Sequence, residues 1–189
     1  GLPDEEGILS LLNREGRILD RFHYHKSMHS PFLSHTEGVS LERKFSGYPT
    51  QSGDNWLSAS SVVGYATPGR ENSQMKNEGE SGHEEGWVVV SPVEFSPDGD
   101  GLDDAVMVGI SPGEPGCVAE VRVFSSDGVC AAIPAQHVLL GSETWFMWEG
   151  KRKDGGEAGP GLYIVYAAIA CRSGSARKYR KVVSLLRRL

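Results

Sequence analysis

The stretch FSPDGDGLDDAVMV, residues 95–108, holds the densest group of side chains that could bind a cation. Asp98, Asp100 and Asp104 follow the spacing D-x-D-G-x-x-D, and alternate acids in a glycine-kinked loop can direct several oxygens at one Ca²⁺ ion. The alternative is a plain turn, in which the aspartates form Asx turns and the glycines take positive φ. An EF-hand is excluded, because the loop lacks a glycine at its sixth position and a glutamate at its twelfth. Calcium and the plain turn therefore remain as alternatives.

A second group that could bind a metal is the run HYHKSMH, which contains His23, His25 and His29. On a strand, His23 and His25 share one face, so both could reach one Zn²⁺ ion. The alternative is an exposed strand and loop in which the histidines are merely polar. No HExxH helix accompanies the run. A zinc-dependent hydrolase built on these histidines is therefore only a third hypothesis.

Other chemistries find no support in the residues. The chain has no GxSxG motif, and the acids of the glycine-rich loop would repel a phosphate. The net charge of −6 argues against general nucleic-acid binding, which needs a basic face. The chain contains no run of about 18 apolar residues, so a membrane-spanning helix is not expected. We therefore expect a protein that is not an enzyme, has no catalytic residues and requires no cofactor, with Ca²⁺ as the alternative.

The three cysteines give little constraint. Cys117, Cys130 and Cys171 do not follow a CxxC spacing, so a zinc ribbon is not expected, and the odd count allows at most one internal disulfide. Cys117 and Cys130 could pair across a hairpin, and free buried thiols are the alternative.

The elements that must position these residues are short strands. Glycine (24) and proline (10) punctuate the chain, and runs rich in Val, Ile, Leu, Phe and Tyr lie between them. This pattern is typical of an all-β sandwich. The predicted strands of the second half are 88–95, 105–111, 118–124, 129–133, 143–148, 162–171 and 176–186. Seven strands in about 100 residues is the size of an immunoglobulin-like (Ig-like) antiparallel β-sandwich.

Residues 70–86, RENSQMKNEGESGHEEG, are polar and acidic and are predicted to form a flexible linker. They divide the chain into parts 1–69 and 87–189. In the first part, ILSLLNREGRILDRFHY predicts a hairpin and GVSLER a third strand. Three strands make a poor isolated core. We therefore expect the chain to begin inside a domain.

The second part resembles the Ig-like modules at the C-termini of type IX secretion cargo, of the gliding-motility and flagellar-hook-cap kind. The resemblance covers about 100 residues and rests on EFSPDGDGLDDAVMV, VRVFSSDGVC, FMWEGKRKDGGEAGPGLYIVY and KYRKVVSLL, in this order. It implies structural roles for Trp148, Gly161 and Tyr163 in the pattern WxG…DGG…xGxY. Trp148 would pack in the sandwich, whereas Trp145, three residues earlier, would face the opposite side.

The first part resembles the second half of a bacterial lamin-tail domain, which is itself Ig-like. The matching pieces are LLNREGRILDRFHY, GVSLER and NWLSASSVVGYATPGRENSQ. Together the two resemblances imply the C-terminal region of a secreted cell-surface protein, which passes through the periplasm to the cell surface, the outer membrane or the exterior. Its partners would be the outer-membrane machinery (translocon, shuttle and sortase-like peptidase) and upstream domains of the same polypeptide.

The end of the chain is strongly basic. Residues 170–189 carry seven Lys and Arg side chains and no acid, on an acidic chain. They are either the solvated face of an edge strand or a recognition strip for an acidic receptor. The resemblance implies the second role, since the last strands of such modules carry much of the sorting signal. The candidate recognition residues are Arg177, Lys178, Arg180, Lys181, Arg187 and Arg188.

These observations lead to two main hypotheses. In the first, residues 87–189 are a non-catalytic sorting signal for type IX secretion and surface attachment. In the second, the chain is a structural or adhesive surface module whose aspartate loop is stabilised by calcium.

Overall fold

The computed structural model describes residues 2–75 and 86–187. The chain divides into two compact units, Gly1–Glu84 and Glu85–Leu189. Strands dominate the described residues, and the helices among them are three-residue 3-10 turns, which confirms the all-β fold class. In the same residues, no helix has the length and apolar character needed to cross a membrane.

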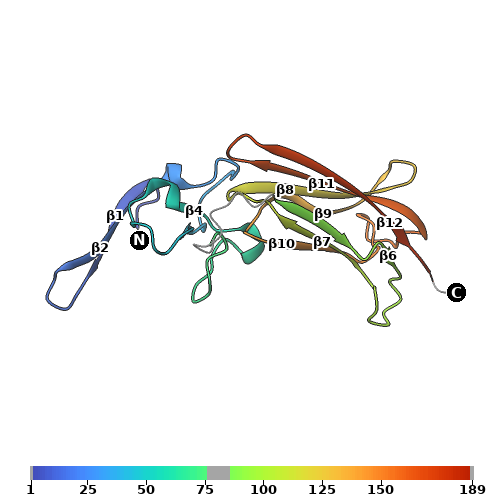
Figure 1. The fold of residues 1–189 in the computed structure, drawn as a ribbon, viewed down its shortest axis with the longest axis horizontal. Coiled ribbons are helices and arrows are strands. Elements are labelled where there is room, and N and C mark those ends of the chain that lie inside the picture. Colours follow the sequence, from blue (N-terminus) through green and yellow to red (C-terminus); the bar gives the residue numbers. More distant parts are fainter. Residues whose placement is uncertain (1, 76–85, 188–189) are drawn as a thin grey trace. The chain divides into compact units, whose positions relative to one another are not determined.

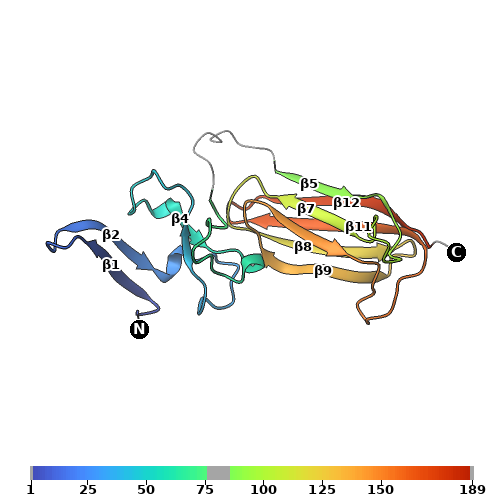
Figure 2. The same cartoon turned by 90° about the horizontal axis from the view of Figure 1, so that it is seen from below.

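The C-terminal unit is a sandwich of two β-sheets (Figures 1 and 2). One sheet has the strand order β6-β12-β11-β8-β9 and the other the order β10-β7-β5. Neighbouring strands are antiparallel except β6 and β12, which run parallel. The strands are β5 (Trp87–Ser91), β6 (Glu94–Phe95), β7 (Val106–Ser111), β8 (Cys117–Ser125), β9 (Cys130–Leu139), β10 (Thr144–Trp148), β11 (Gly161–Cys171) and β12 (Ala176–Leu185).

The core lies between the two sheets because burial alternates along their strands. In β8 and β11, every second side chain is buried and the intervening ones are partly or fully exposed, as expected for strands with one face on a core. The buried cluster draws Val108 and Ile110 from one sheet and Val121, Val165 and Val183 from the other. Each such side chain contributes roughly 1.5–3 kcal/mol through burial.

Two predicted strands differ from the observed ones. Predicted strand 88–95 is two strands in different sheets, since Pro92 interrupts it after a cis Ser91–Pro92 bond. Proline has no N–H for a sheet ladder, so the ladder breaks there. Predicted strand 129–133 instead continues to Leu139 through Pro134. β9 is an edge strand, where a proline can be tolerated.

The disulfide joins Cys117 to Cys171, whereas the hairpin pairing with Cys130 considered above is not formed. Cys117 begins β8 and Cys171 ends β11, and the antiparallel register places them directly opposite each other, with Cα atoms 4.0 Å apart. Cys130 is a free thiol and is partly buried. The pairing thus depends on the β8–β11 contact between strands far apart in sequence.

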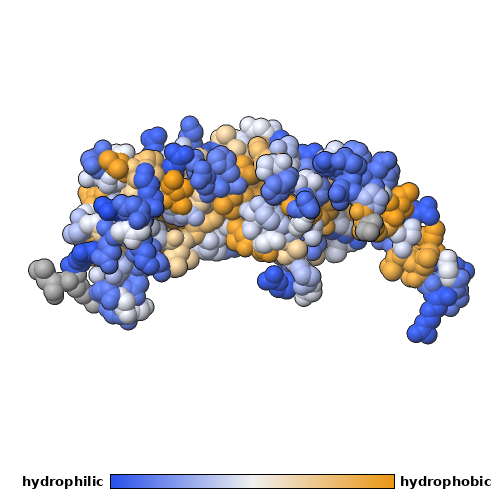
Figure 3. Space-filling view, turned by 180° about the vertical axis from the view of Figure 1, so that it is seen from behind, coloured by the Kyte–Doolittle hydropathy of each residue, from blue (hydrophilic) through white to orange (hydrophobic). Residues whose placement is uncertain are grey.

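The N-terminal unit begins with the predicted hairpin. Strands β1 (Glu6–Leu12) and β2 (Ile18–His25) pair with each other, and β3 (Leu41–Arg43) pairs with β4 (Trp56–Ser58). The short turns are η1 (Lys26–Met28), η2 (Gly53–Asn55) and η3 (Ser61–Val63). The described residues of this unit form two separate two-stranded sheets. The hairpin exposes apolar side chains beside a polar tip (Figure 3).

The interior of the N-terminal unit is largely polar. Among its described residues, three apolar side chains are buried, those of Phe22, Leu57 and Ala59. The carboxylate of Glu42 is also buried and accepts hydrogen bonds from the hydroxyls of Thr67 and Ser73. These bonds satisfy a carboxylate that would otherwise be costly to bury.

The beginning of the predicted linker belongs to this unit. Ser73 donates to Glu42 and also accepts the backbone N–H of Ser60, at 2.8 Å, while Gln74 is 2% exposed. Residues 70–75 therefore continue the packed N-terminal unit. Residues 76–85 of the predicted linker lie outside the described residues.

Candidate functional site

Asp104 closes the acidic loop between β6 and β7. Its carboxylate accepts the backbone N–H groups of Gly99, at 2.7 Å, and Gly101, at 2.8 Å. Both glycines have positive φ, of 80° and 85°, which residues with a Cβ rarely adopt. The loop geometry is therefore maintained by one carboxylate and two glycines.

The other two aspartates form the local bonds of Asx turns. Asp98 accepts the N–H of Asp100, at 3.2 Å, and Asp100 accepts the N–H of Leu102, at 2.8 Å. These are the bonds that the plain-turn interpretation predicts. Oxygens of Asp98, Asp100 and Asp104 also lie within 4.8 Å of one another. A carboxylate oxygen has two lone pairs, so one that accepts an N–H can still face a cation.

The three candidate zinc ligands have separate partners. His23 Nε2 lies 3.9 Å from a carboxylate oxygen of Glu6, and His25 and His29 each bond to a serine hydroxyl. Among the described residues, two groups of three or more His, Cys, Asp and Glu have ligand atoms within 4.8 Å of one another, and these histidines are in neither. Burial lowers the pKa of His29 below its usual value.

The residues with expected structural roles lie at one end of the sandwich. Trp148 is 3% exposed, and its indole N–H donates to the carbonyl of Lys151, at 2.8 Å. Its ring meets that of Tyr163 at 5.0 Å, and the Tyr163 hydroxyl donates to the carbonyl of Gly159, at 2.7 Å. Gly161 has a φ of 146°, which L residues rarely adopt. All three positions thus have a structural reason for their residue type.

Trp145 faces the opposite side of β10 from Trp148, as its spacing predicts. It is 45% exposed, and its indole N–H donates to the carboxylate of Glu143, at 2.6 Å. Its ring lies over Gly109 of β7, where a Cβ would approach the ring within 2.6 Å. The glycine therefore leaves the space that the indole ring occupies.

Two of the candidate recognition residues are engaged within the C-terminal unit. The guanidinium of Arg177 donates to the carbonyl of Pro112, at 2.6 Å, and is partly buried. Arg187 forms an ion pair with Glu157. These two arginines help to fix β12 to neighbouring loops, a role that their position in a basic run did not reveal.

Lys178, Arg180 and Lys181 are the exposed cations of β12. Within the described part of the chain, none of them forms an ion pair with an acid. The Arg180 guanidinium lies 6.0 Å from the ring centre of Tyr166, on the outer face of the sheet. Arg188, the remaining candidate, lies outside the described residues. The site thus has three exposed cations within four positions.

One edge of β12 is open over most of its length. β12 pairs with β11 from one end to the other, whereas β6 covers its other edge only at Ser184 and Leu185. Residues 176–182 have no strand partner on that edge among the described residues. At about 3.3 Å per residue, the open edge is roughly 23 Å long. We call residues 176–182 the open edge.

The sequence located the cations and offered an edge strand as one interpretation, but it did not predict how much of the edge is open. The residue that could have indicated the open edge is Pro92, since β5 ends just before it and the chain then joins the other sheet as β6. Because β6 is only two residues long, it covers only the last part of β12.

Comparison with known proteins gives no family assignment. No protein-family model matches the chain, and no curated protein matches it. The solved structures similar to it include dimeric latent PorU from Porphyromonas gingivalis, with 15% identity and a TM-score of 0.42 over 55% of this chain and 9% of PorU.

Two other solved structures are similar to the chain, at identities and TM-scores that are also low. PorZ, a surface component of the type IX secretion system of P. gingivalis, has 18% identity and a TM-score of 0.36, over 94% of this chain and 20% of PorZ. CopC from Methylosinus trichosporium OB3b has 10% identity and a TM-score of 0.36, over 55% of this chain and 96% of CopC. Identities and scores this low do not establish a function.

Proposed function

We propose that the C-terminal unit is a non-catalytic sorting module of a secreted surface protein, recognised by the outer-membrane machinery of type IX secretion. The observation that carries the proposal is the open edge of β12 with its three exposed cations. An unpaired strand edge offers backbone donors and acceptors to a partner, and charged side chains beside it select which partner binds.

The sequence resemblance supports the same role. The ordered motifs of residues 87–189 resemble terminal modules of type IX cargo, in which the last strands carry much of the signal. The three exposed cations lie on the last strand of this unit. The proposed partners are the translocon, the shuttle and the sortase-like peptidase.

The disulfide agrees with an exported protein. Disulfides persist in the periplasm and outside the cell and are rare in the bacterial cytosol. The Cys117–Cys171 bond lies within the sandwich, where both residues are at most 4% exposed. It would form once the chain reaches the oxidising periplasm.

The test is export of a passenger fused to the full 189-residue chain. We expect the fusion to reach the cell surface, and the triple variant K178E/R180E/K181E to remain inside the cell. The matched control is K151E/R152E/K153E, which makes the same charge change in the same unit at the turn after β10. A melting curve for each variant checks folding. Failure of the wild-type fusion, or equal export of both triple variants, would contradict the proposal.

A second candidate function is that of a structural surface module whose acidic loop binds calcium. The observation in its favour is the 4.8 Å grouping of Asp98, Asp100 and Asp104. Calcium at 100 times its dissociation constant should stabilise such a module by about 2.7 kcal/mol, because the ion binds only the folded state. The rise in melting temperature should disappear in Asp100→Ala. An unchanged melting curve in millimolar calcium would exclude this function.

A further inference from the structure

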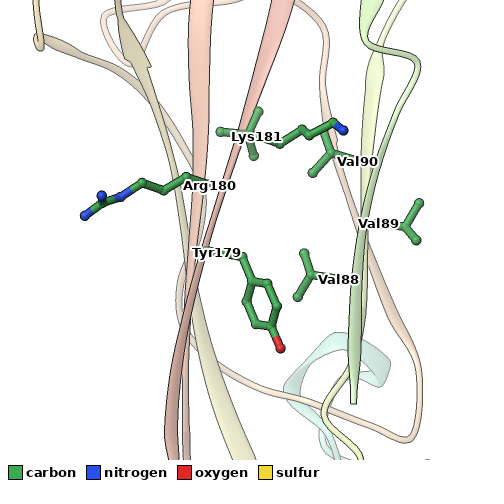
Figure 4. Close-up of a pocket in the computed structure, with 8 residues that line it drawn as sticks. Val88, Val89, Val90, Tyr179, Arg180 and Lys181 are labelled. Carbon is green, nitrogen blue, oxygen red and sulfur yellow. The ribbon is translucent and has the colours of Figure 1, made fainter. Parts of the chain in front are cut away.

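The open edge of β12 lies beside a groove between the two sheets. The groove has a volume of about 260 Å³ and opens between β12 of one sheet and β5 of the other, with β11 contributing to its wall (Figure 4). Its lining residues are Val88, Val89, Val90, Val165, Ala167, Tyr179, Arg180 and Lys181. The strand edge and the groove therefore form one continuous surface.

Side chains of β12 alternate between this groove and the outer face of the sheet. Tyr179 and Lys181 point from β12 toward Val88 and Val90 of β5, whereas Arg180 points to the other side of the strand (Figure 4). An added strand next to β12 would alternate in the same way. Half of its side chains would enter an apolar groove, and half would lie beside the exposed cations.

The backbone of the open edge is oriented for such pairing. Ser184 donates its N–H to the carbonyl of Val93, at 2.7 Å, away from β11. Successive residues of a strand direct their N–H groups to alternate edges. The N–H groups of Lys178, Arg180 and Val182 must therefore point outward, along the direction of Ser184. They are available for hydrogen bonds with a new strand.

We infer that the open edge binds an extended, acidic segment of a partner protein, which adds a strand beside β12. Its inward side chains would be apolar and would contact Tyr179 and Val88, with one acid near Lys181. Its outward side chains would be acidic and would lie beside Lys178 and Arg180. A segment of about seven residues would fill the edge, at 3.3 Å per residue.

Charge decides between a partner and a second copy of this chain. Two copies paired edge to edge through β12 would bring Lys178, Arg180 and Lys181 against the same cations, and like charges opposite each other on paired strands are destabilising. An acidic segment would instead neutralise them, and this attraction would also speed association. The occupant that fits the edge is therefore an acidic strand and not another β12.

This inference deepens the proposed function and rests on it only for the biological purpose of binding. The groove and the edge are properties of the folded chain and can be tested in vitro. Peptide binding without any effect of K178E/R180E/K181E on export would leave the docking surface in place and remove the sorting role. Charge-dependent export without peptide binding would do the opposite.

The binding experiment uses the full chain and two fluorescent seven-residue peptides. One alternates glutamate with valine, and the other alternates lysine with valine. We expect the acidic peptide to bind at least about tenfold more tightly at low salt, as measured by fluorescence anisotropy. K178E/R180E/K181E should invert this preference, whereas K151E/R152E/K153E should keep it. Equal binding of both peptides, or none up to about 1 mM protein, would overturn the inference.

A backbone variant tests whether the peptide adds as a strand. Val182→Pro removes one outward N–H and leaves the ladder with β11 intact, while Val182→Ala removes the side chain and keeps the N–H. We expect Val182→Pro to weaken binding about tenfold relative to Val182→Ala, through the loss of one hydrogen bond. Equal affinities would exclude binding through the strand edge.

Two further measurements complete the test. Peptide binding should slow hydrogen exchange at the amides of Lys178, Arg180 and Val182, and unchanged exchange would overturn strand addition. Sedimentation of the chain alone should give a monomer. A dimer that depends on the open edge and resists the acidic peptide would show that a second copy occupies the site, against the inference.

Discussion

The side chain of Asp104 is compatible with both interpretations of the acidic loop, the plain turn and the calcium site. Its carboxylate accepts two backbone N–H groups of the loop, and the same group is near two other aspartates. The loop bonds exist without any ion, so the carboxylate has a structural reason to be there. Removal of this side chain should therefore affect folding whether or not calcium binds.

We expect Asp104→Ala to lower the free energy of unfolding by about 1–2 kcal/mol, because two N–H groups lose a charged acceptor. Urea denaturation in the presence of a chelator measures this value. The control is Asp103→Asn, which also removes a charge and suits the positive φ of 50° at that position. Equal stability of the two variants would show that Asp104 does not support the loop.

His29 gives the N-terminal unit a dependence on pH. Burial lowers the pKa of His29 in the folded state, and its Nδ1 lies 2.9 Å from the hydroxyl oxygen of Ser58. The unfolded chain then binds more protons than the folded chain as the pH falls below about 6.5. The contribution of His29 to the free energy of unfolding should therefore be fully present above that pH and should be lost as the pH falls through the folded-state pKa.

An NMR titration of the imidazole C–H resonances measures this effect directly. The folded-state midpoint of His29 should lie below 6.5, and His29→Gln should remove its share of the loss of stability in acid. A midpoint above 6.5 would mean that a nearby acid outweighs burial.

For single residues, the sequence predicts contacts with near neighbours in the chain better than contacts with distant residues. The pattern of aspartates and glycines predicted Asx turns, because those bonds are local. Arg177 was predicted to be free for recognition, yet it donates to the carbonyl of Pro112, 65 residues away in sequence. No local pattern contains a contact over that distance.

Strand pairing determines the covalent cross-link of the molecule. Cys117 and Cys171 meet because β8 and β11 are neighbours in the sheet, although the two residues are 54 positions apart. The sequence suggested either a pairing of Cys117 with the nearer Cys130, across a hairpin, or free thiols, and Cys130 is in fact the free one. Elements could be predicted from composition, but their order within the sheets could not, because that order depends on packing.

We expect the double variant C117S/C171S to lose about 4 kcal/mol of stability, since a bond that closes a loop of this length restricts the unfolded chain. Denaturation with and without a reducing agent measures the loss. Cys130→Ser is the matched control and should change little, because that thiol is unpaired. Unchanged stability of the wild-type chain on reduction would contradict this expectation.

Most predicted strands are observed within a few residues, because alternation and turn residues are local signals. Of the two exceptions, 129–133 continues to Leu139, whereas 88–95 forms two strands in two sheets, and this second difference leaves the open edge. A break at a proline was foreseeable. The sheet that the chain would join after the break was not, since it depends on the buried side chain of Phe95.

At the scale of the whole molecule, the two units differ in the character of their interiors. The buried cluster of the C-terminal unit is apolar and lies entirely within residues 95–185. The N-terminal unit buries few apolar side chains among its described residues and relies on polar groups such as Glu42. The expectation of a poor core in the first part agrees with this difference.

We predict that residues 86–189, produced alone, keep the melting transition that the same unit shows in the full chain, because the apolar cluster needs no residue of the first part. Differential scanning calorimetry of both proteins makes the comparison. A decrease of more than a few degrees would show that the N-terminal unit supports the sandwich.

The Cys117–Cys171 bond also has a mechanical consequence. When force is applied to the two ends of the chain, the load crosses this bond directly, so the residues between the cysteines are never stretched. Pulling at the C-terminus can peel β12 away from β11, but the tear must stop where Cys171 is tethered. An atomic-force trace should therefore gain the length that corresponds to the sequence separation of 54 between the cysteines only after reduction.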